Sequence, residues 1–253
     1  MIDTHCHLTD ARLLDQLDDV LRRASEAGVS RMVTVSTELN DARSSVALCH
    51  GRPNLRCTVG VHPNYSQHVK VEEIAQLREI QDDASVIALG EMGLDYFHGH
   101  ASRAHQADIF RAQLELANAL DRPVVIHCRE AVDDTLAIMK DFADVPAVFH
   151  CFTGTLGGAR RILDAGYLIG LTGVVTFKKS DELRAVAKMV PDDRLLVETD
   201  APYLTPEPMR KMKVNEPALV MHTAAAIAQE RGISLEQLDY LTTQNTMRFF
   251  RWE

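Results

Sequence analysis

Long apolar segments are missing from this chain of 253 residues. No stretch approaches the roughly 18 consecutive apolar residues that a membrane helix needs. The first residues, Met1 to His5, lack the basic start and the apolar run of a signal peptide. We therefore expect a cytoplasmic protein with no membrane partner, and no motif indicates an obligate protein partner.

The five cysteines are an odd number, so a complete disulfide framework is not expected and reduced thiols fit better. Low-complexity tracts are also missing. With 46% hydrophobic and 25% charged residues, the composition is that of a chain with a sizeable core, and it excludes disorder, collagen and coiled coil.

Basic residues are in deficit, because 27 Lys plus Arg oppose 36 Asp plus Glu and the formal net charge is −9. This balance disfavours a broad basic surface for duplex nucleic acid. An anionic substrate would need local positive charge, which divalent cations can supply. Short, frayed or single-stranded nucleic acid is favoured over long duplex.

No glycine-rich phosphate turn follows the first strand, which disfavours an open doubly wound sheet, the alternative fold. Apolar strand patterns alternate with helical patterns along the chain, and proline-rich sequence then precedes closing helices near 218–231 and 235–248. This order predicts one α/β domain over residues 1–253, a (β/α)8 TIM barrel with additional C-terminal helices. The eight expected strands are 2–7, 31–35, 55–61, 86–91, 123–127, 147–151, 167–171 and 195–198.

Residues of the types that bind metals recur at the ends of these strands. His5 and His7 lie two apart, so strand alternation turns both toward one point. In a barrel all strand carboxyl ends open on the face that carries the active site. The residues predicted to gather there as ligands for divalent ions are His5, His7, Glu91, His127, His150 and Asp200.

The six ligands divide between two ions. His5, His7 and Asp200 come from the first and eighth strands, which are neighbours in a barrel, and His127 and His150 come from the fifth and sixth. The remaining ligand, on the fourth strand, is placed to bridge both ions. Paired ions stabilise the attacking and departing oxygens of a displacement and lower the pKa of a bound water, so hydrolysis is the expected chemistry.

Seven sequence blocks stand out along the chain: Asp3-Thr4-His5-Cys6-His7, Gly60-Val61-His62-Pro63, Gly90-Glu91-Met92-Gly93-Leu94-Asp95-Tyr96, His127-Cys128-Arg129, His150-Cys151-Phe152-Thr153-Gly154, Glu198-Thr199-Asp200-Ala201-Pro202-Tyr203-Leu204 and Asn215-Glu216-Pro217-Ala218. They resemble the TatD family of metal-dependent deoxyribonucleases, in the family's order and over nearly the whole chain. The resemblance implies an amidohydrolase-like TIM barrel that cleaves DNA, with magnesium or manganese supporting activity. It also implies a first metal site at His5, His7, Glu91 and Asp200 and a second at Glu91, His127 and His150.

Two positions depart from the family pattern. Asn64 stands where the family often has a second histidine, and Lys213-Val214 stands where Arg or Lys followed by Arg is common. Substrate contacts at these positions are therefore not carried over.

The expected reaction is in-line attack of a metal-activated water on a phosphodiester, which makes the protein a hydrolase of ester bonds. Asp200 is the candidate general base and Glu91 the second catalytic residue. Two divalent ions are expected, with Mg, Mn and Zn all compatible with the ligands. The predicted substrate contacts are His62, Arg129 and Lys178 for phosphate and Tyr203 for stacking on an unpaired base.

Other enzyme classes use similar ligands. A dinuclear amidohydrolase or lactonase commonly bridges its ions with a carbamylated lysine on the fourth strand, where this chain has Glu91. A zinc deaminase ordinarily uses one ion, and a non-catalytic metal-dependent binding protein would bind substrate without turnover. Cys6, Cys128 and Cys151 adjoin ligands but are expected to turn away, so a cysteine nucleophile is not favoured.

Overall fold

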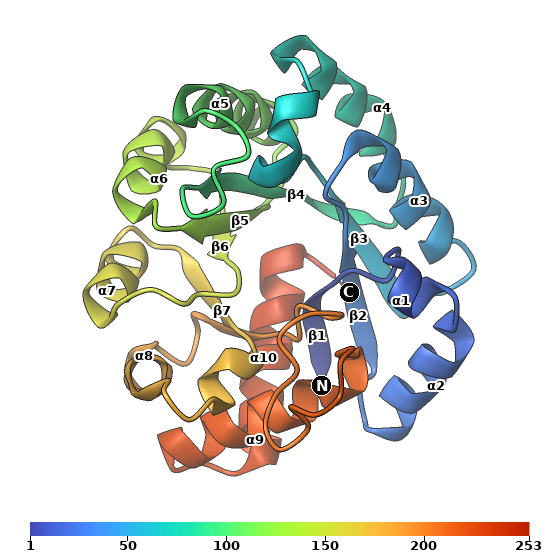
Figure 1. Ribbon diagram of the computed structural model, residues 1–253, viewed down its shortest axis with the longest axis vertical. Helices are drawn as coiled ribbons and strands as arrows, with labels where there is room; N and C mark the ends of the chain where they lie inside the picture. The colour runs from blue at the N-terminus through green and yellow to red at the C-terminus, as the bar shows by residue number, and fades with distance from the viewer. Residues whose placement is uncertain (253) are drawn as a thin grey trace. The chain divides into compact units, whose positions relative to one another are not determined.

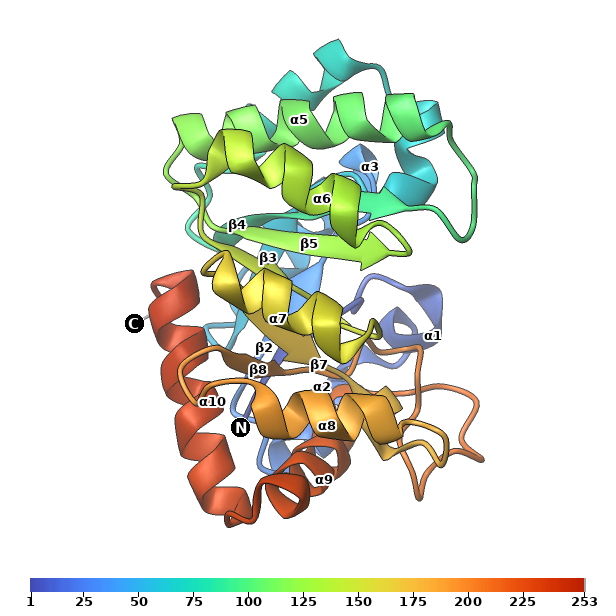
Figure 2. The same ribbon diagram turned by 90° about the vertical axis from the view of Figure 1, so that its left-hand side faces the viewer.

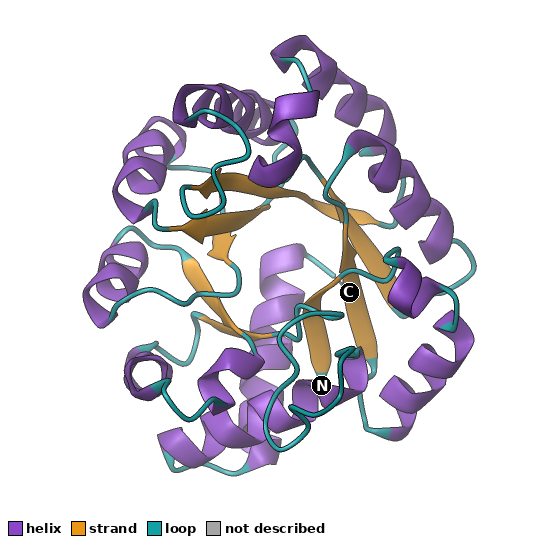
Figure 3. Cartoon of the chain, in the orientation of Figure 1, coloured by secondary structure: helices purple, strands orange, loops and turns teal. Residues whose placement is uncertain are grey.

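The computed structural model describes residues 1–252, and strands and helices alternate along them (Figure 3). The described chain divides into two compact units. Unit 1 comprises residues 1–34 and the chain from 151 onward, and unit 2 comprises residues 35–150. Residue 253 lies outside the described residues, and one domain over 1–253 stays a prediction.

Unit 1 contains the strands from both ends of the barrel sequence. Strand β1 pairs in parallel with β2, and β7 pairs in parallel with β8. A bridge between Cys6 and Ala201 links β1 to the segment after β8. The elements are β1 (Ile2–Cys6), α1 (Ala11–Leu14), α2 (Leu17–Glu26), β2 (Arg31–Val35, whose last residue is in unit 2), α7 (Leu156–Asp164), β7 (Leu168–Leu171), η4 (Gly173–Thr176), α8 (Asp181–Met189), β8 (Leu195–Val197), η5 (Pro217–Leu219), α9 (Val220–Arg231) and α10 (Leu235–Phe250).

Unit 2 is a run of four parallel strands in the order β3-β4-β5-β6. Helices α5 and α6 run beside β4 and β5 (Figures 1 and 2). The elements are α3 (Leu39–Cys49), β3 (Leu55–Val59), η1 (Pro63–His68), η2 (Val71–Gln76), α4 (Leu77–Ile80), β4 (Val86–Asp95), α5 (Arg103–Ala119), β5 (Val124–Arg129), α6 (Val132–Met139), η3 (Lys140–Phe142) and β6 (Ala147–Phe149).

Local sequence explains where the long helices start. The Ser102 hydroxyl accepts the His105 amide at 3.2 Å and so caps α5, whose apolar side buries Phe110 and Leu114. At the start of α10, the side chains of Ser234 and Gln237 each accept the other's backbone amide, at 3.1 and 2.9 Å. Helix ends that satisfy their own amides lower the cost of packing a helix against a strand.

Eight strands, parallel in every pairing within each unit and separated by helices, are the element order of the predicted (β/α)8 TIM barrel. The predicted closing helices are α9 and α10. Among residues 1–252, no helix is both long enough and apolar enough to cross a membrane.

The single tryptophan of the chain, Trp252, belongs to unit 1. Its side chain is buried, and the Arg31 guanidinium carbon lies 5.0 Å from the centre of its ring. Arg31 also donates to the Trp252 carbonyl at 3.3 Å. The end of the described chain is thereby fixed to the start of β2.

Candidate metal centre

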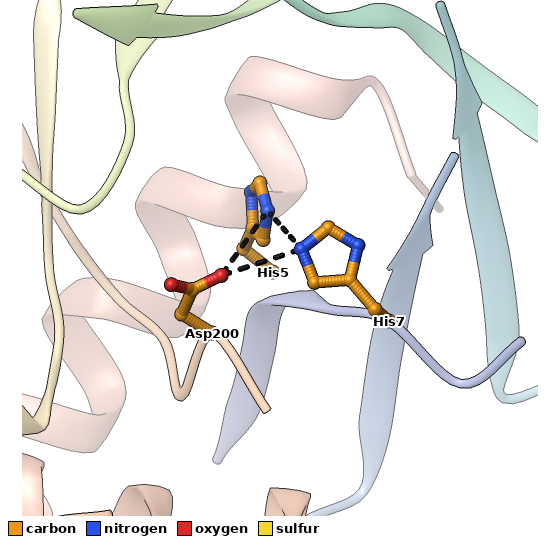
Figure 4. A group of neighbouring side chains, drawn as sticks. All are labelled: His5, His7 and Asp200. Carbon is orange, nitrogen blue, oxygen red and sulfur yellow. Dashed lines mark hydrogen bonds and ion pairs between the residues drawn. The ribbon is translucent and has the colours of Figure 1, made fainter. Parts of the chain in front are cut away.

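The first candidate ligand group lies in unit 1 and consists of His5, His7 and Asp200, here named the Asp200 cluster (Figure 4). The Nε2 atoms of His5 and His7 lie 3.3 Å apart. The Asp200 Oδ1 atom lies 3.7 Å from His5 Nε2 and 3.3 Å from His7 Nε2. The predicted convergence of the histidine pair with Asp200 is therefore present in the structure.

Backbone hydrogen bonds bring these ligands together. Asp200 donates its amide to the His5 carbonyl at 2.8 Å, and His7 donates to the Ala201 carbonyl at 2.7 Å. Alternation along β1 turns Cys6 away from the cluster, and its thiol donates to the Val33 carbonyl at 3.4 Å. Cys6 is fully buried, as expected of a packing residue.

A buried acidic residue, Asp3, holds the residue that precedes Asp200. Asp3 accepts the Thr199 amide at 2.9 Å and the Thr199 hydroxyl at 2.6 Å. Burial outweighs these bonds and raises the pKa of Asp3 to about 8. Asp3 stands in the first sequence motif, but the sequence did not reveal that its side chain is buried.

Glu198 supports the same cluster, and it explains a glycine in β7. Its carboxylate accepts the Thr4 hydroxyl at 3.2 Å and the Cys151 amide at 2.5 Å. A Cβ atom on Gly170 would lie 2.7 Å from the Glu198 Oε2 atom, closer than real Cβ contacts allow. A larger residue at position 170 would therefore require the Glu198 carboxylate to shift.

The Asn215 block of the sequence has a structural role in unit 1. The buried Asn215 amide donates to the Thr199 carbonyl at 3.0 Å and to the Tyr203 carbonyl at 2.6 Å. The next residue, Glu216, forms an ion pair with Arg23 at 2.7 Å. The block thus fixes the turn that carries Asp200.

The second candidate ligand group lies in unit 2 and consists of His62, Glu91 and His127. His150 also contacts Glu91, and we name these four residues the Glu91 cluster. Three imidazole nitrogens surround one carboxylate oxygen, Glu91 Oε1. It lies 3.2 Å from His62 Nε2, 2.8 Å from His127 Nδ1 and 2.6 Å from His150 Nε2. The rings of His62 and His127 are only 4.3 Å apart between centroids.

The predicted end of the fourth strand at Glu91 is wrong. Strand β4 continues to Asp95, and its pairing with β5 shifts register between Leu89 and Met92, so Glu91 lies at an irregularity inside the strand. A local apolar pattern does not reveal such an irregularity. The predicted end of the fifth strand at His127 is also wrong, because β5 continues to Arg129, which pairs with Asp95 of β4.

Two glycines allow the backbone to approach β5 closely on either side of Glu91. Gly90 and Gly93 have backbone φ angles of +124° and +137°, values that residues other than glycine rarely adopt. A Cβ at Gly90 would collide with the Val125 carbonyl oxygen, and one at Gly93 with the His127 carbonyl oxygen. The two glycines of the Gly-Glu-Met-Gly block therefore set the position of Glu91.

The ionisable side chains of the Glu91 cluster shift one another's pKa values. Burial opposes ionisation of Glu91, but His150, His62 and His127 hold its pKa well below the usual value. Burial lowers the pKa of His62 to about 4, so this ring is neutral at pH 7. Burial also opposes protonation of His127, yet hydrogen bonds to Asp95 and Glu91 raise its pKa. An ionised carboxylate among imidazole nitrogens is a donor set that suits zinc, manganese or iron.

Comparisons with known proteins identify the family. A family model described as TatD related DNase matches residues 2–251. The chain belongs to this family. It is a metal-dependent hydrolase, as its relatives are named.

Three relatives illustrate the similarity. The uncharacterized metal-dependent hydrolase YcfH of Escherichia coli strain K12 is 38% identical over 99% of this chain and 95% of its own. The 3'-5' ssDNA/RNA exonuclease TatD of Cronobacter sakazakii is also 38% identical, over 99% of this chain and 97% of its own. The crystal structure of YJJV, a TatD homologue from Escherichia coli K12, matches with a TM-score of 0.94 at 29% identity, over 99% of this chain and 98% of that one. Its likeness confirms the predicted fold.

Sequence analysis of this TatD-family chain missed the role of Asp95. This carboxylate is fully buried, and its Oδ2 atom lies 3.0 Å from the Nε2 atom of His127, the nitrogen that does not face Glu91. Burial opposes its ionisation, but hydrogen bonds from His127 and from the His98 amide and side chain hold its pKa far below the usual value. A carboxylate on the outer nitrogen fixes a ligand histidine in orientation and tautomer. The sequence signal for this role of Asp95 was its position four residues after Glu91 in the same motif.

The predicted substrate contacts have different surroundings. His62 belongs to the Glu91 cluster, where it is a candidate ligand, while Lys178 is exposed in the segment after η4. Tyr203 is 47% exposed, and its ring lies edge-on to that of His7 at 6.1 Å, with the Arg12 guanidinium 4.6 Å above it. Arg129 is exposed and stacks on Phe97, 4.2 Å from the ring centre.

Two of the cysteines beside candidate ligands are poor nucleophiles, as the sequence indicates. Burial raises the pKa of Cys128 to about 11 and that of Cys6 well above its usual value. All five cysteines are free thiols. Thiolate attack by Cys6 or Cys128 therefore has no support.

Proposed function

We propose that this protein hydrolyses phosphodiester bonds in single-stranded nucleic acid, with DNA as the first candidate. The observation that carries the proposal is the Glu91 cluster, where one ionised carboxylate oxygen lies within 3.2 Å of three imidazole nitrogens. A relative named as a 3'-5' ssDNA/RNA exonuclease supports the substrate class.

The proposal includes two divalent ions. One ion would be held by His5, His7 and Asp200, and the other by His127 and His150, with His62 beside them. The sequence motifs assign Glu91 to both ions. Bound divalent cations lower the pKa of water and neutralise charge on phosphate oxygens.

The residues of the chain would then act in separate roles. Asp200 would accept the proton of the attacking water, since its side chain is 14% exposed and so reachable from solvent. Asp95 would hold His127 in position. Tyr203 would stack on an unpaired base, and Arg129 and Lys178 would contact phosphate.

The test is hydrolysis of end-labelled single-stranded DNA with Mg²⁺, Mn²⁺ or Zn²⁺, each beside an EDTA control. A lactone and adenosine serve as comparison substrates. We expect cleavage that needs metal, and we expect Glu91→Ala to reduce the rate by more than about 100-fold. Glu72→Ala is the matched control, because Glu72 is an exposed carboxylate of η2 outside both clusters.

Turnover of the lactone or of adenosine in place of DNA would overturn the proposed substrate class. Unchanged cleavage by Glu91→Ala would overturn the proposed site. Labels at the 5′ end and at the 3′ end of the strand, and a matched RNA strand, then give the polarity and the sugar preference.

A further inference from the structure

The segment between β4 and α5 presents an exposed aromatic side chain, Phe97, to which the proposed function gives no role. Phe97 is 56% exposed, and the guanidinium of Arg129 lies over its ring at 4.2 Å. The ring of His98 stands edge-on to Phe97 at 4.9 Å and is parallel to that of His100, with an interplanar angle of 8° at 5.9 Å. We name Phe97, His98, His100 and Arg129 the Phe97 platform.

A single carboxylate ties this platform to the Glu91 cluster. Asp95 Oδ2 lies 3.0 Å from His127 Nε2 and 2.8 Å from His98 Nδ1. Asp95 Oδ1 accepts the amides of Phe97 and His98 at 3.0 and 2.9 Å. The same residue therefore orients a candidate metal ligand and the first residues of the platform.

The base of the platform is held by buried hydrogen bonds. The Gln106 side chain is buried, accepts the Asp95 amide at 2.8 Å and donates to the Asp95 carbonyl at 3.0 Å. Arg129 comes two residues after His127 in β5, so the two side chains leave the strand on the same face. The platform thus has a defined position beside the cluster within unit 2.

The chemistry of the platform matches unpaired bases. A lone exposed apolar side chain needs no explanation, but this one is combined with a guanidinium and two imidazoles. Aromatic faces beside cationic groups bind successive bases of single strands, and stacking tolerates any base and either sugar. Arg129 is exposed, so its charge is available to a phosphate.

We propose that the Phe97 platform stacks unpaired bases of the strand that the Glu91 cluster cleaves. The inference rests on the proposed function and extends it, because it assigns recognition of the base to a surface separate from the ligands. It also predicts that duplex DNA, whose bases already stack on one another, gains nothing from Phe97.

The test measures binding without turnover, using EDTA-treated protein and the fluorescence anisotropy of labelled oligothymidylate. A matched oligomer whose central nucleotides are abasic is compared with it. We expect the parent protein to bind the intact strand about tenfold more tightly than the abasic one, and we expect Phe97→Ala to lose this preference for DNA and for RNA. Phe97→Trp should keep it, and Tyr240→Ala, which removes a 66% exposed aromatic of α10, is the matched control.

Each outcome decides the inference. A Phe97→Ala protein that still prefers the intact strand overturns it, and so does a parent protein with no preference. The inference is also overturned if Phe97→Ala lowers the affinity for the intact strand, the abasic strand and duplex DNA by the same factor. Such an equal loss would reflect general damage to the protein. Failure of the proposed function appears separately, as absence of metal-dependent cleavage in the parent protein.

Discussion

The two ligand clusters differ most in the aspartate that supports each. Asp3 lies behind the Asp200 cluster and Asp95 beside the Glu91 cluster, and both side chains are fully buried. Burial raises the pKa of Asp3 to about 8, whereas histidine and amide donors hold the pKa of Asp95 far below its usual value. The same residue type is therefore neutral in one setting at pH 7 and ionised in the other.

The donors explain the difference. Asp3 accepts from the Thr199 amide and hydroxyl and from the His5 amide, which carry no charge, and the nearby Glu198 carboxylate raises its pKa further. Asp95 accepts from His127 and His98, which can become cations. Burial raises the pKa of both carboxyls, and only Asp95 has histidine donors that offset this rise.

Removal of one ligand from each cluster should have the largest effect. If each cluster holds one ion, His7→Ala and His127→Ala should each bind one ion fewer than the parent protein and lose more than about 100-fold in cleavage rate. Metal content per chain, measured by mass spectrometry after equilibration with Mn²⁺, checks this. His68→Ala, which alters an exposed histidine of η1, should keep the parent stoichiometry. Equal metal content in all three variants would contradict two separate clusters.

Replacement of the supporting aspartates should have a smaller and unequal effect. Asp95→Asn removes the negative charge beside His127, so metal affinity should fall by about 10 to 100-fold. Asp3→Asn should change affinity less, because Asp3 reaches the Asp200 cluster only through backbone amides and the Thr199 hydroxyl. Calorimetric titration with Mn²⁺ measures both. The comparison fails if the two variants lose the same affinity.

The last expected effect concerns the pH dependence of stability. A carboxyl whose pKa is raised on folding stabilises the fold fully below the unfolded-state pKa, and that contribution is lost as pH rises toward 8. The metal-free parent protein should therefore lose up to about 1.4 kcal/mol of unfolding free energy per pH unit through Asp3 between roughly pH 4 and 8. Asp3→Asn should lack this loss. Urea unfolding in EDTA at pH 5.5 and 7.5 checks the difference, and parallel behaviour of the two proteins would refute it.

The fold and most of the candidate site could be predicted from the sequence for a specific reason. Alternation in β1 places His5 and His7 on one face, and parallel strands carry their ligands near their carboxyl ends. These are properties of single strands, so a local pattern reveals them. The irregularity at Glu91 depends on close approach of Gly90 and Gly93 to β5, which no local pattern records.

Other residues were missed because their roles depend on loop conformation. Phe97 follows the strand block and looks like any apolar residue, and only the folded segment places Arg129 over its ring. Asp95 appeared in a quoted block without a role, since its contacts with His98 and His127 join a loop to a different strand. Strand period predicts ligands, but it does not predict the groups that orient them.

Burial of Trp252 beneath Arg31 makes the intrinsic emission of the protein a local reporter. Trp252 is the only tryptophan of the chain and lies in unit 1. Tryptophan emission therefore follows unfolding of unit 1 and does not report on unit 2. A Phe97→Trp protein would add a second, solvent-facing fluorophore in the silent part. Nucleotides would quench the emission of this exposed tryptophan, and the emission of buried Trp252 would serve as the internal standard.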